Sequence, residues 1–414
     1  MATYANVPVN SHVSLGQLSH LLSGDAGPLS VKPSLHLPTM IPWAALFAWN
    51  CRASAVEHTA AALGALLSRA EAGWDGVWKQ AGIDMAGGTM GEHATAEGQS
   101  SSPWRAKEGY LILQRSEADM RRSRAGAELR RRFVPGLQMR QLSSDEVLQL
   151  EPNLNPDTCG GGAWFFPEAW YLKDPGALLR RLAGAVEAGG GVIRTGKTVV
   201  AIQDSDKDRG DGMTRNQTNH GAVCALLDDG TRFSADEIVV AAGAHSAPLA
   251  SSFCPLDTER GYSITFAPGS ESALARAVCD PGAGWIATPM AGGLRVAGKV
   301  ELGGTRAAPT PALHDRLERE ARALLGDGVG RRVAARDWLG CRPTMPDALP
   351  VIGRSRRRPE SVFYAFGHQH VGWTLGGITG QLIAELVQGK ETAVDLAPYC
   401  LDRFRFRNQI RGRR

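Results

Sequence analysis

Hydrophobic positions along the chain follow a helical period in some stretches. In residues 42–81, Ala, Leu and Trp recur at every third or fourth position, which predicts helices. Residues 118–133 predict a basic helix, and residues 313–325 predict a helix near the C-terminal part of the chain. Residues 142–152 place a Ser cap ahead of acidic residues and a Leu face, so a short helix should stop at Pro152.

In other stretches, hydrophobic residues alternate with polar ones or form the short apolar runs that are typical of strands. EGYLILQ (108–114) alternates, residues 261–303 predict a run of strands, and a further strand is expected at Val192. FSADEIVVAAGAHSAPLA (233–250) predicts a buried apolar strand, an Ala-Gly turn and the start of a helix. Asp174 and Pro175 suit the cap and first position of a helix that ends at 189–191.

Segments rich in small and polar residues separate these elements. Residues 1–39 predict an extended, loop-dominated segment, 87–103 a polar loop, and 205–221 a long hairpin loop. Strands alternate with helices in the middle and at the end, and a cluster of strands lies between. The sequence therefore predicts an α/β protein with a mostly parallel sheet domain and an antiparallel-rich second domain.

Length, composition, net charge and cysteine count narrow the class of protein. With 414 residues, 43% of them hydrophobic and 21% charged, the chain has room for two globular domains. A net charge of +4 does not argue for nucleic-acid binding. The seven cysteines are scattered without a CxxC pair, so we expect neither a metal site nor a disulfide framework, and reduced thiols suit a cytoplasmic protein.

Two segments bear on membranes. The apolar stretch 40–51 is too short to span a bilayer, and no basic-then-apolar leader is visible at the start. The tail FRFRNQIRGRR (404–414) combines five arginines with two aromatic residues. Peripheral contact with the anionic inner membrane and a solvated chain terminus are the two interpretations, of which the solvated terminus is the more common.

The most specific stretch is VFYAFGHQHVGWTLGGITGQLIAELVQG (362–389), which predicts a strand, a Gly/His loop and an amphipathic helix. Such an arrangement directs backbone N–H groups and the positive end of a helix towards an anionic ligand. Glycines 376 and 377 lie inside the predicted helix, where glycine is unfavourable unless another group approaches closely. Two histidines without nearby Cys, Asp or Glu make a poor metal site, so we expect no metal here.

Two further motifs carry candidate chemistry. In RPTMPDALPVIG (342–353), Arg342 precedes a stiff Pro-rich turn and presents a planar fork of donors, which suits a carboxylate. The alternative is a structural salt bridge. In VVAAGAHS (239–246), Ala242 and Gly243 follow an apolar strand and allow the backbone to approach a ligand closely, although an ordinary strand-to-helix turn has the same pattern.

Together these motifs resemble the FAD-dependent D-amino-acid oxidase-like (DAO) oxidoreductases, and in particular the D-amino-acid dehydrogenases. ERGYSITF (259–266) and GWIATPMAGGLRVAGKVELGG (284–304) resemble the substrate-domain strands of that branch. The resemblance implies a two-dinucleotide-binding-type FAD domain and an antiparallel-sheet substrate domain. It places residues 1–50, 170–258 and 335–400 in the FAD domain. Residues 51–169 and 259–334 fall in the substrate domain, and 401–414 form a basic tail.

The resemblance also implies the roles of individual residues. Arg342 would grip the α-carboxylate of the substrate, the Tyr262 hydroxyl would lie near its carboxylate or amine, and His370 would complete the catalytic set. The residues expected to contact FAD are Thr3, Asn6, Val199, Ala242, Gly243, Gly367, His368, Val371, Gly372, Trp373 and Thr374.

Some strand residues have plainer interpretations. Tyr262 is also what an ordinary core or edge position of a strand contains. One of the two loop histidines is expected to line the flavin pocket and the other to be structural. Arg295 and Glu301 lie in the resembling strand, but charges on strands are usually solvated, so we assign them no catalytic role.

The implied reaction is oxidative deamination of a D-amino acid, or of a related secondary amine such as a D-proline derivative. Hydride would pass from Cα to flavin N5, the imine would hydrolyse to a 2-oxo acid, and a quinone or the respiratory chain would accept the electrons. No G-x-G-x-x-G turn lies between a strand and a helix, since 87–91, 189–193 and 326–330 have the wrong context. The first βαβ unit is therefore expected to be missing, and a non-catalytic remnant with weak FAD binding is the alternative.

Overall fold

The computed structural model describes residues 5, 29–32, 37–85, 104–205, 223–268, 274–326 and 329–405 of the chain. Expectations that lie outside these residues concern most of the segment 1–39, the polar loop 87–103, most of the hairpin loop 205–221, the tail beyond residue 405, Thr3 and Asn6.

Three consecutive helices confirm the periodicity of residues 42–81. They are α2 (Leu37–Asn50), α3 (Ala53–Leu67) and α4 (Ala70–Gln80). Helix α3 buries Leu63, Leu66 and Leu67, whose spacing places them on one side of the helix. This side packs into one core cluster with α9 (Gly372–Val387), the helix predicted at the C-terminal end.

Polar caps fix the starts of the next helices. The Ser116 hydroxyl accepts from the N–H of Asp119 at the start of α5 (Glu117–Phe133), the basic helix that was expected. Ser143 and Glu146 form a capping box at α6 (Ser144–Leu150), which ends ahead of Pro152 as predicted. The Asp174 carboxylate caps α7 (Pro175–Ala188) in the same way.

The strand expected at Val192 is absent. The chain between α7 and β7 (Val199–Asp204) forms neither helix nor strand, and Val192 is 76% exposed. Strand β7 begins where antiparallel pairing with β8 (Val223–Leu227) begins. An apolar run becomes a strand only where a neighbour satisfies its backbone groups, so the prediction at Val192 was wrong.

The expectation for residues 233–250 was right for a strand ahead of Ala242 and Gly243, but wrong for a single strand and for the helix that should follow. The segment forms two short strands, β9 (Arg232–Ala235) and β10 (Ile238–Val240), followed by the 3-10 turns η4 (Gly243–His245) and η5 (Ala247–Leu249). The strands belong to different sheets, because β9 pairs with β8 whereas β10 pairs with β17 (Val362–Phe366). The change of sheet breaks the single buried strand that the apolar run suggested.

The largest sheet of the described residues has nine strands, in the order β15-β11-β14-β13-β12-β3-β5-β4 with β1 beside β14. Its strands are β1 (Leu29–Val31), β3 (Tyr110–Leu113), β4 (Arg140–Leu142), β5 (Ala163–Phe166), β11 (Asp257–Phe266), β12 (Ala277–Asp280), β13 (Trp285–Met290), β14 (Gly293–Leu302) and β15 (Trp338–Thr344). Most pairs are antiparallel, which confirms the strand cluster predicted for 261–303.

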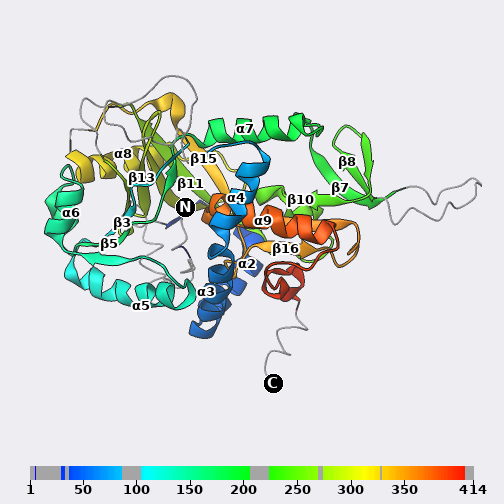
Figure 1. The fold of residues 1–414 in the computed structure, drawn as a ribbon, viewed down its shortest axis with the longest axis horizontal. Helices are drawn as coiled ribbons and strands as arrows, with labels where there is room; N and C mark the ends of the chain where they lie inside the picture. Colours follow the sequence, from blue (N-terminus) through cyan, green and yellow to red (C-terminus); the bar gives the residue numbers. More distant parts are fainter. Residues whose placement is uncertain are drawn as a thin grey trace, which may run out of the picture.

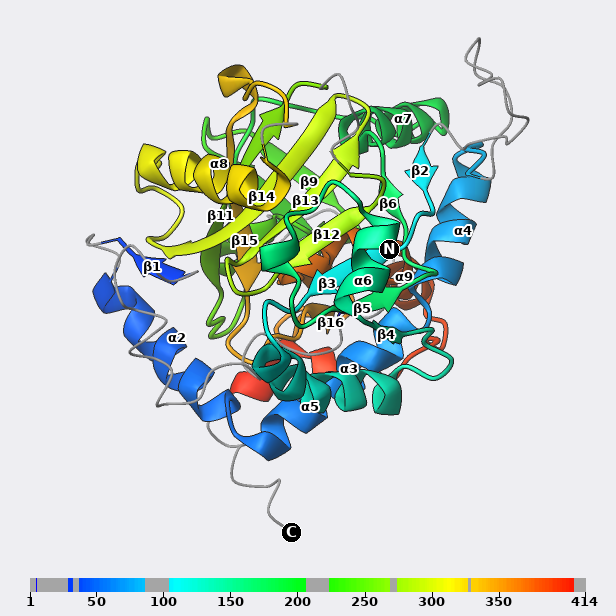
Figure 2. The same cartoon turned by 90° about the vertical axis from the view of Figure 1, so that its left-hand side faces the viewer.

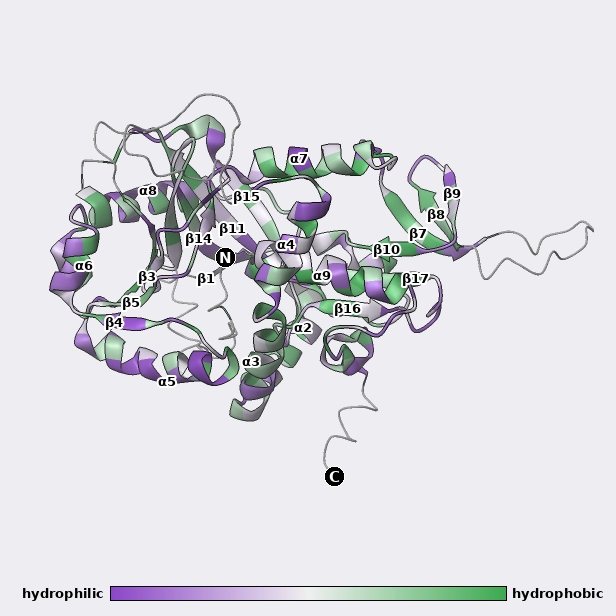
Figure 3. Ribbon diagram, viewed as in Figure 1, coloured by the Kyte–Doolittle hydropathy of each residue, from purple (hydrophilic) through white to green (hydrophobic). Residues whose placement is uncertain are grey.

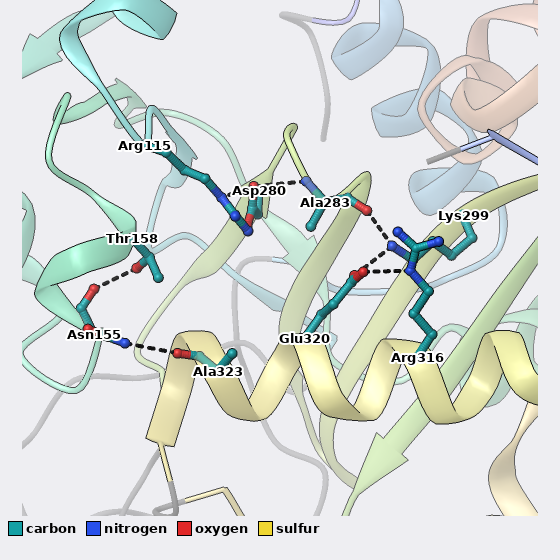
Figure 4. A network of polar contacts seen from close by, with 9 residues as sticks. All are labelled: Arg115, Asn155, Thr158, Asp280, Ala283, Lys299, Arg316, Glu320 and Ala323. Carbon is teal, nitrogen blue, oxygen red and sulfur yellow. Dashed lines mark hydrogen bonds and ion pairs between the residues drawn. The ribbon is translucent and has the colours of Figure 1, made fainter. Parts of the chain in front are cut away.

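Helix α8 (Pro311–Leu325) crosses one face of this large sheet (Figure 2). Leu317, Ala321 and Leu324 of α8 join the core cluster formed by β11, β13 and β14. A polar network also joins the helix to the sheet (Figure 4). Lys299 Nζ, buried on β14, donates to the Ala283 carbonyl at 2.6 Å and to Glu320 of α8 at 2.5 Å. Pairing of this kind is what makes a buried ammonium tolerable.

A small sheet with the order β10-β17-β16 lies towards the other end of the molecule (Figure 1). Strand β10 is parallel to β17, and β16 (Val351–Arg354) is antiparallel to it. The strands of this sheet are mostly hydrophobic, whereas α5 on the opposite side carries a large hydrophilic share (Figure 3). The remaining short elements are β2 (Arg105–Ala106), β6 (Tyr171–Leu172), η3 (Pro156–Thr158), η7 (Ala334–Arg336), η8 (Gln369–Val371), η9 (Ala397–Tyr399) and η10 (Leu401–Phe404).

The mixed α/β class is confirmed by this architecture, with one extensive antiparallel sheet and one small sheet that contains a parallel pair. The assignment of residue ranges to a FAD-binding and a substrate domain stays a prediction.

Candidate active site

A cavity of about 990 Å³ lies where the large sheet meets α4, α7 and the N-terminal end of α9. Its aromatic walls include Trp74, Trp78, Trp170, Trp338 and Trp373. The charged side chains along it are Arg295, Arg336 and Arg342, and no carboxylate of the described residues lines it. Apolar walls with a few cationic groups suit an organic anion.

Arg342 reaches the cavity from β15 by crossing the neighbouring strand β11 at Gly261. A β-carbon at position 261 would lie 2.2 Å from Nη2 of Arg342, so only glycine leaves room for the guanidinium. Nη1 donates to the carbonyl of Lys299 at 3.2 Å. Among the described residues, no carboxylate oxygen lies within 4.0 Å of this guanidinium, which therefore lacks an ion-pair partner in the protein part described.

The neighbours of Arg342 respond to its charge. Glu259 lies directly opposite it in the β11–β15 ladder and is 8% exposed. Burial raises the pKa of Glu259, and the charge of Arg342 acts in the other direction. The His370 side chain is exposed towards the cavity. Burial of the ring by the surrounding protein lowers its pKa to about 4, and the charge of Arg342 acts in the same direction. The imidazole of His370 is therefore neutral at neutral pH.

The loop after β17 lies next to Arg342, since a backbone bridge joins Thr344 to His368. Gly367 has a φ of 81°, which suits glycine, and η8 then leads into α9 at Gly372. Val371 caps α9 without a side-chain hydrogen bond, so its first N–H groups receive no capping side chain. Gln369, His370, Trp373 and Thr374 line the cavity.

The two loop histidines take different positions. His370 faces the cavity, whereas the Nε2 atom of His368 lies 3.0 Å from the hydroxyl of Thr379 on α9. Burial lowers the pKa of His368 to about 4. This arrangement agrees with one lining and one structural histidine, and the contact of either ring with a flavin stays a prediction.

Ala242 and Gly243 lie close to the same loop. Strands β10 and β17 are parallel and in register, so their carboxyl ends meet at one edge of the small sheet. The turn η4 lies against β15, and a β-carbon on Gly243, whose φ is 54°, would meet no atom within 4 Å. Ligands commonly bind at such an edge. Val199 lies in β7, where it pairs with Leu227 of β8, and its contact with FAD stays a prediction.

The structure gives the reason for two of the helix glycines. A β-carbon on Gly377 would lie 2.4 Å from the backbone nitrogen of Trp74, and one on Gly376 would lie 2.9 Å from the Trp74 ring. Helix α4 is therefore the group that approaches α9 closely at these positions.

Tyr262 contributes to the cavity lining, but its hydroxyl is used elsewhere. The hydroxyl donates to Glu301 at 2.7 Å and accepts from the N–H of Thr310 at 3.0 Å, and the ring packs edge-on against His314 of α8. These partners lie on the α8 side of the large sheet. We therefore do not retain the Tyr262 hydroxyl as a substrate contact.

Arg295 and Glu301, both given no role from the sequence, are not solvated. Arg295 lines the cavity, donates to the Ser263 hydroxyl at 3.1 Å and lies 5.6 Å from the Trp338 ring centroid. Glu301 is 3% exposed and lies 3.2 Å from Arg260. The two residues are six positions apart, so strict alternation along β14 would have placed their side chains on the same face. The irregularity in β14, where Lys299 has a φ of 58° and the register against β11 shifts between Arg260 and Tyr262, could not be predicted from the sequence.

Comparison with known proteins identifies the family. A protein-family model described as "DAO: FAD dependent oxidoreductase" matches residues 53–386, most of the chain. The chain belongs to the DAO family of FAD dependent oxidoreductases. FAD is the cofactor of this family.

Similar curated proteins carry two kinds of name. One from Bradyrhizobium diazoefficiens, "D-amino-acid oxidase", is 33% identical over 65% of this chain and 61% of its own length. Another from Cereibacter sphaeroides, "D-amino acid dehydrogenase", is 27% identical over 72% of this chain and 65% of its own length. The chain thus spans less than two thirds of the length of both relatives.

A solved structure supports the same fold. The crystal structure of glycine oxidase from Geobacillus kaustophilus matches 82% of this chain and 83% of its own, with a TM-score of 0.63 and 24% identity. The DAO fold expected from the resemblance is confirmed, and this likeness supports the fold alone.

The residues around η8 and η4 fit one end of an FAD molecule. The N-cap of α9 makes no side-chain hydrogen bond, and Trp373 and Thr374 of its first turn line the cavity. A β-carbon on Gly243 would meet no atom within 4 Å. N–H donors at a helix N-terminus suit the carbonyl-bearing edge of a flavin ring, which becomes more negative on reduction. Thr3 and Asn6, expected near the pyrophosphate, lie outside the described residues.

Three further observations concern the described residues. They contain no cluster of three or more His, Cys, Asp or Glu side chains that could hold a metal. None of their helices is both long and apolar enough to cross a membrane. All seven cysteines of this DAO-family chain are unpaired.

Proposed function

We propose that this protein oxidises the amine of a D-amino acid, or of a related secondary amine such as a D-proline derivative, with FAD as cofactor. The family membership supports FAD-dependent oxidation, and the names of two relatives, an oxidase and a dehydrogenase of D-amino acids, support the substrate class.

The observation that carries the proposal is Arg342. Its guanidinium is largely buried on the cavity wall, and the described residues offer it no carboxylate within 4.0 Å. A buried cation without a carboxylate partner is costly, so a carboxylate that entered the cavity would be strongly favoured. The α-carboxylate of an amino acid supplies such a group, and the planar guanidinium would bind it through two parallel hydrogen bonds.

The remaining walls would hold the substrate amine. The buried side chains of Trp74, Trp78 and Trp170 supply apolar walls, and the neutral imidazole of His370 offers an acceptor nitrogen to the amine. With the carboxylate held by Arg342, the amine and the Cα hydrogen are directed towards the α9 N-terminus, so orientation does most of the work. When bound, FAD supplies the acceptor for the hydrogen and electron pair lost from Cα, and the resulting imine hydrolyses to a 2-oxo acid.

The electron acceptor that reoxidises the cofactor forms part of the proposal. We propose a quinone or the respiratory chain, which would suit a cytoplasmic protein with peripheral contact at the inner membrane. Support comes from the relative named a dehydrogenase. Reoxidation of the reduced protein by a soluble quinone, compared with dissolved oxygen, tests this point directly.

The central experiment is the visible absorbance spectrum of the purified chain supplied with FAD. Anaerobic addition of D-alanine should bleach the bound flavin, whereas L-alanine should not, and Arg342→Met should reduce the bleaching rate at least about a hundredfold. A protein that binds FAD but is not bleached by any D-amino acid would contradict the proposal. A protein that stays colourless with FAD would instead support the alternative of a non-catalytic remnant.

A further inference from the structure

A second guanidinium faces the cavity beside Arg342. Arg295 projects from β14, and its Nη2 atom donates to the hydroxyl of Ser263 on β11 at 3.1 Å. The Trp338 ring lies over Gly340 and also contacts Arg295 as a cation–π partner, at 5.6 Å from ring centroid to Cζ. Two strands and an indole thus hold Arg295 in a fixed direction.

The spacing of the two guanidinium groups follows from β11. Arg342 lies over Gly261, and Arg295 is bound at Ser263, two residues further along the same strand and on the same face. Two residues of a strand span roughly 7 Å, so the two cationic groups are separated by about that distance. A single carboxylate cannot bridge both, but the two carboxylates of one small dicarboxylic amino acid can.

The charged side chains of the described residues that line the cavity are all cationic. Arg295, Arg336 and Arg342 line it, no described carboxylate does, and none of the three has a carboxylate within 4.0 Å among the described residues. Arg336 is exposed and donates to the Gly292 carbonyl. Arg295 is half-buried, and burial lowers its pKa, as expected for a cation that lacks a counter-charge.

We propose that the substrate is a D-amino acid with an acidic side chain, such as D-aspartate or D-glutamate, whose second carboxylate is bound by Arg295. This inference rests on the proposed amine oxidation and on Arg342 as the partner of the α-carboxylate. Sites that contain a polar group for one substrate reject the analogue that leaves this group unpaired. The neutral amide D-asparagine, of nearly the same size as D-aspartate, should therefore bind more weakly, by at least about tenfold.

The test is a binding experiment on the full chain with FAD supplied. Dissociation constants for D-aspartate, D-asparagine and D-alanine are measured by tryptophan fluorescence, because several indoles line the cavity. Arg295→Gln should lower the preference for D-aspartate over D-asparagine at least about tenfold. Arg121→Gln on α5 removes one positive charge from an exposed pair with Glu117 and should leave that preference unchanged.

The outcomes separate this inference from the proposed function. Equal affinity of the wild-type chain for D-aspartate and D-asparagine, together with measurable binding of D-alanine, overturns the role of Arg295 and leaves amine oxidation standing. No binding of any of the three amino acids would contradict the proposed function itself. If Arg295→Gln does not fold, as judged by circular dichroism, Ser263→Ala removes the hydrogen bond that orients Arg295 and should lower the preference in the same direction.

Discussion

Gly261 determines where the guanidinium of Arg342 lies. The atoms Nη2, Cζ and Nη1 would be 2.2 to 2.3 Å from a β-carbon at this position, so any side chain there must displace them. A residue without a side chain thereby controls the direction of the charge that we propose for substrate binding. The sequence predicted the importance of Arg342, but not that of Gly261, which is far from it along the chain.

Gly261→Ala should therefore weaken the binding of a D-amino acid at least about tenfold and lower the free energy of unfolding by about 1–3 kcal/mol. Gly184→Ala in α7 is the matched control, since a β-carbon there would meet no atom within 4 Å. The control should keep its affinity and gain up to about 1 kcal/mol of stability. Unaltered affinity in Gly261→Ala would show that the guanidinium position does not matter for binding.

His368 should make stability depend on pH. Its pKa is lowered by burial from 6.5 to about 4, so between these values the unfolded chain binds more protons than the folded protein. The free energy of unfolding should fall as pH decreases from about 6.5 towards 4, by up to about 3 kcal/mol from this residue. Urea unfolding over this pH range measures the effect. His368→Gln should make the curve less steep, while His370, whose pKa is lowered to the same value, still contributes. An equally steep curve in the variant would exclude His368 as the source.

At the scale of elements, the contact between α4 and α9 holds one wall of the cavity in place. Gly73 and Gly377 allow the two helices to approach closely, and Trp74 Nε1 donates to the carbonyl of Trp373 at 2.8 Å. Trp74 and Trp373 also stack, with ring centroids 5.8 Å apart. The glycines of α9 thus position the indole walls and the N-terminal turn that faces the cavity.

Two substitutions on the same helix test this packing. Gly377→Ala should destabilise the protein by about 1–3 kcal/mol, because a β-carbon there would lie 2.4 Å from the backbone nitrogen of Trp74. Gly380→Ala, at an exposed position with nothing within 4 Å, should stabilise it by about 0.5–1 kcal/mol. Chemical denaturation of both variants gives the two values. Equal effects would mean that α4 does not constrain α9.

At the scale of the whole molecule, the cavity unites residues that are distant in the sequence. Trp74 comes from α4, Gly261 from β11, Arg342 from β15 and His370 from the loop before α9. A ligand that contacts several of these elements at once stabilises the folded state relative to the unfolded chain.

FAD should accordingly raise the thermal stability of the chain. At a free FAD concentration about a hundred times its dissociation constant, the expected gain is about 2.7 kcal/mol. Differential scanning fluorimetry with increasing FAD measures the shift, and AMP is the control ligand that lacks the flavin ring. A melting temperature that does not respond to FAD would contradict binding by this chain and favour the non-catalytic alternative.

Local features were the most predictable from the sequence. The caps at Ser143 and Asp174 were correctly placed, since capping needs only residues three or four apart. Helix boundaries near 42–81 and 313–325 were close to those observed, because amphipathic periodicity is a local property. Errors arose at Val192 and in 233–250, where the outcome depends on which distant strand offers hydrogen bonds.

The sequence by itself determined the DAO family and the class of cofactor, because these reside in contiguous motifs. It also predicted Arg342 and the loop after β17 as site residues, and their roles stay predictions. Only the tertiary structure decided which side chains share the cavity. It showed that the Tyr262 hydroxyl donates to Glu301 and that Gly377 leaves room for helix α4. It also showed that Arg295 and Arg342 line the same cavity. The physical reason is that strand pairing and helix packing join residues that no local pattern connects, and a strand's sequence does not say which of its faces meets the core.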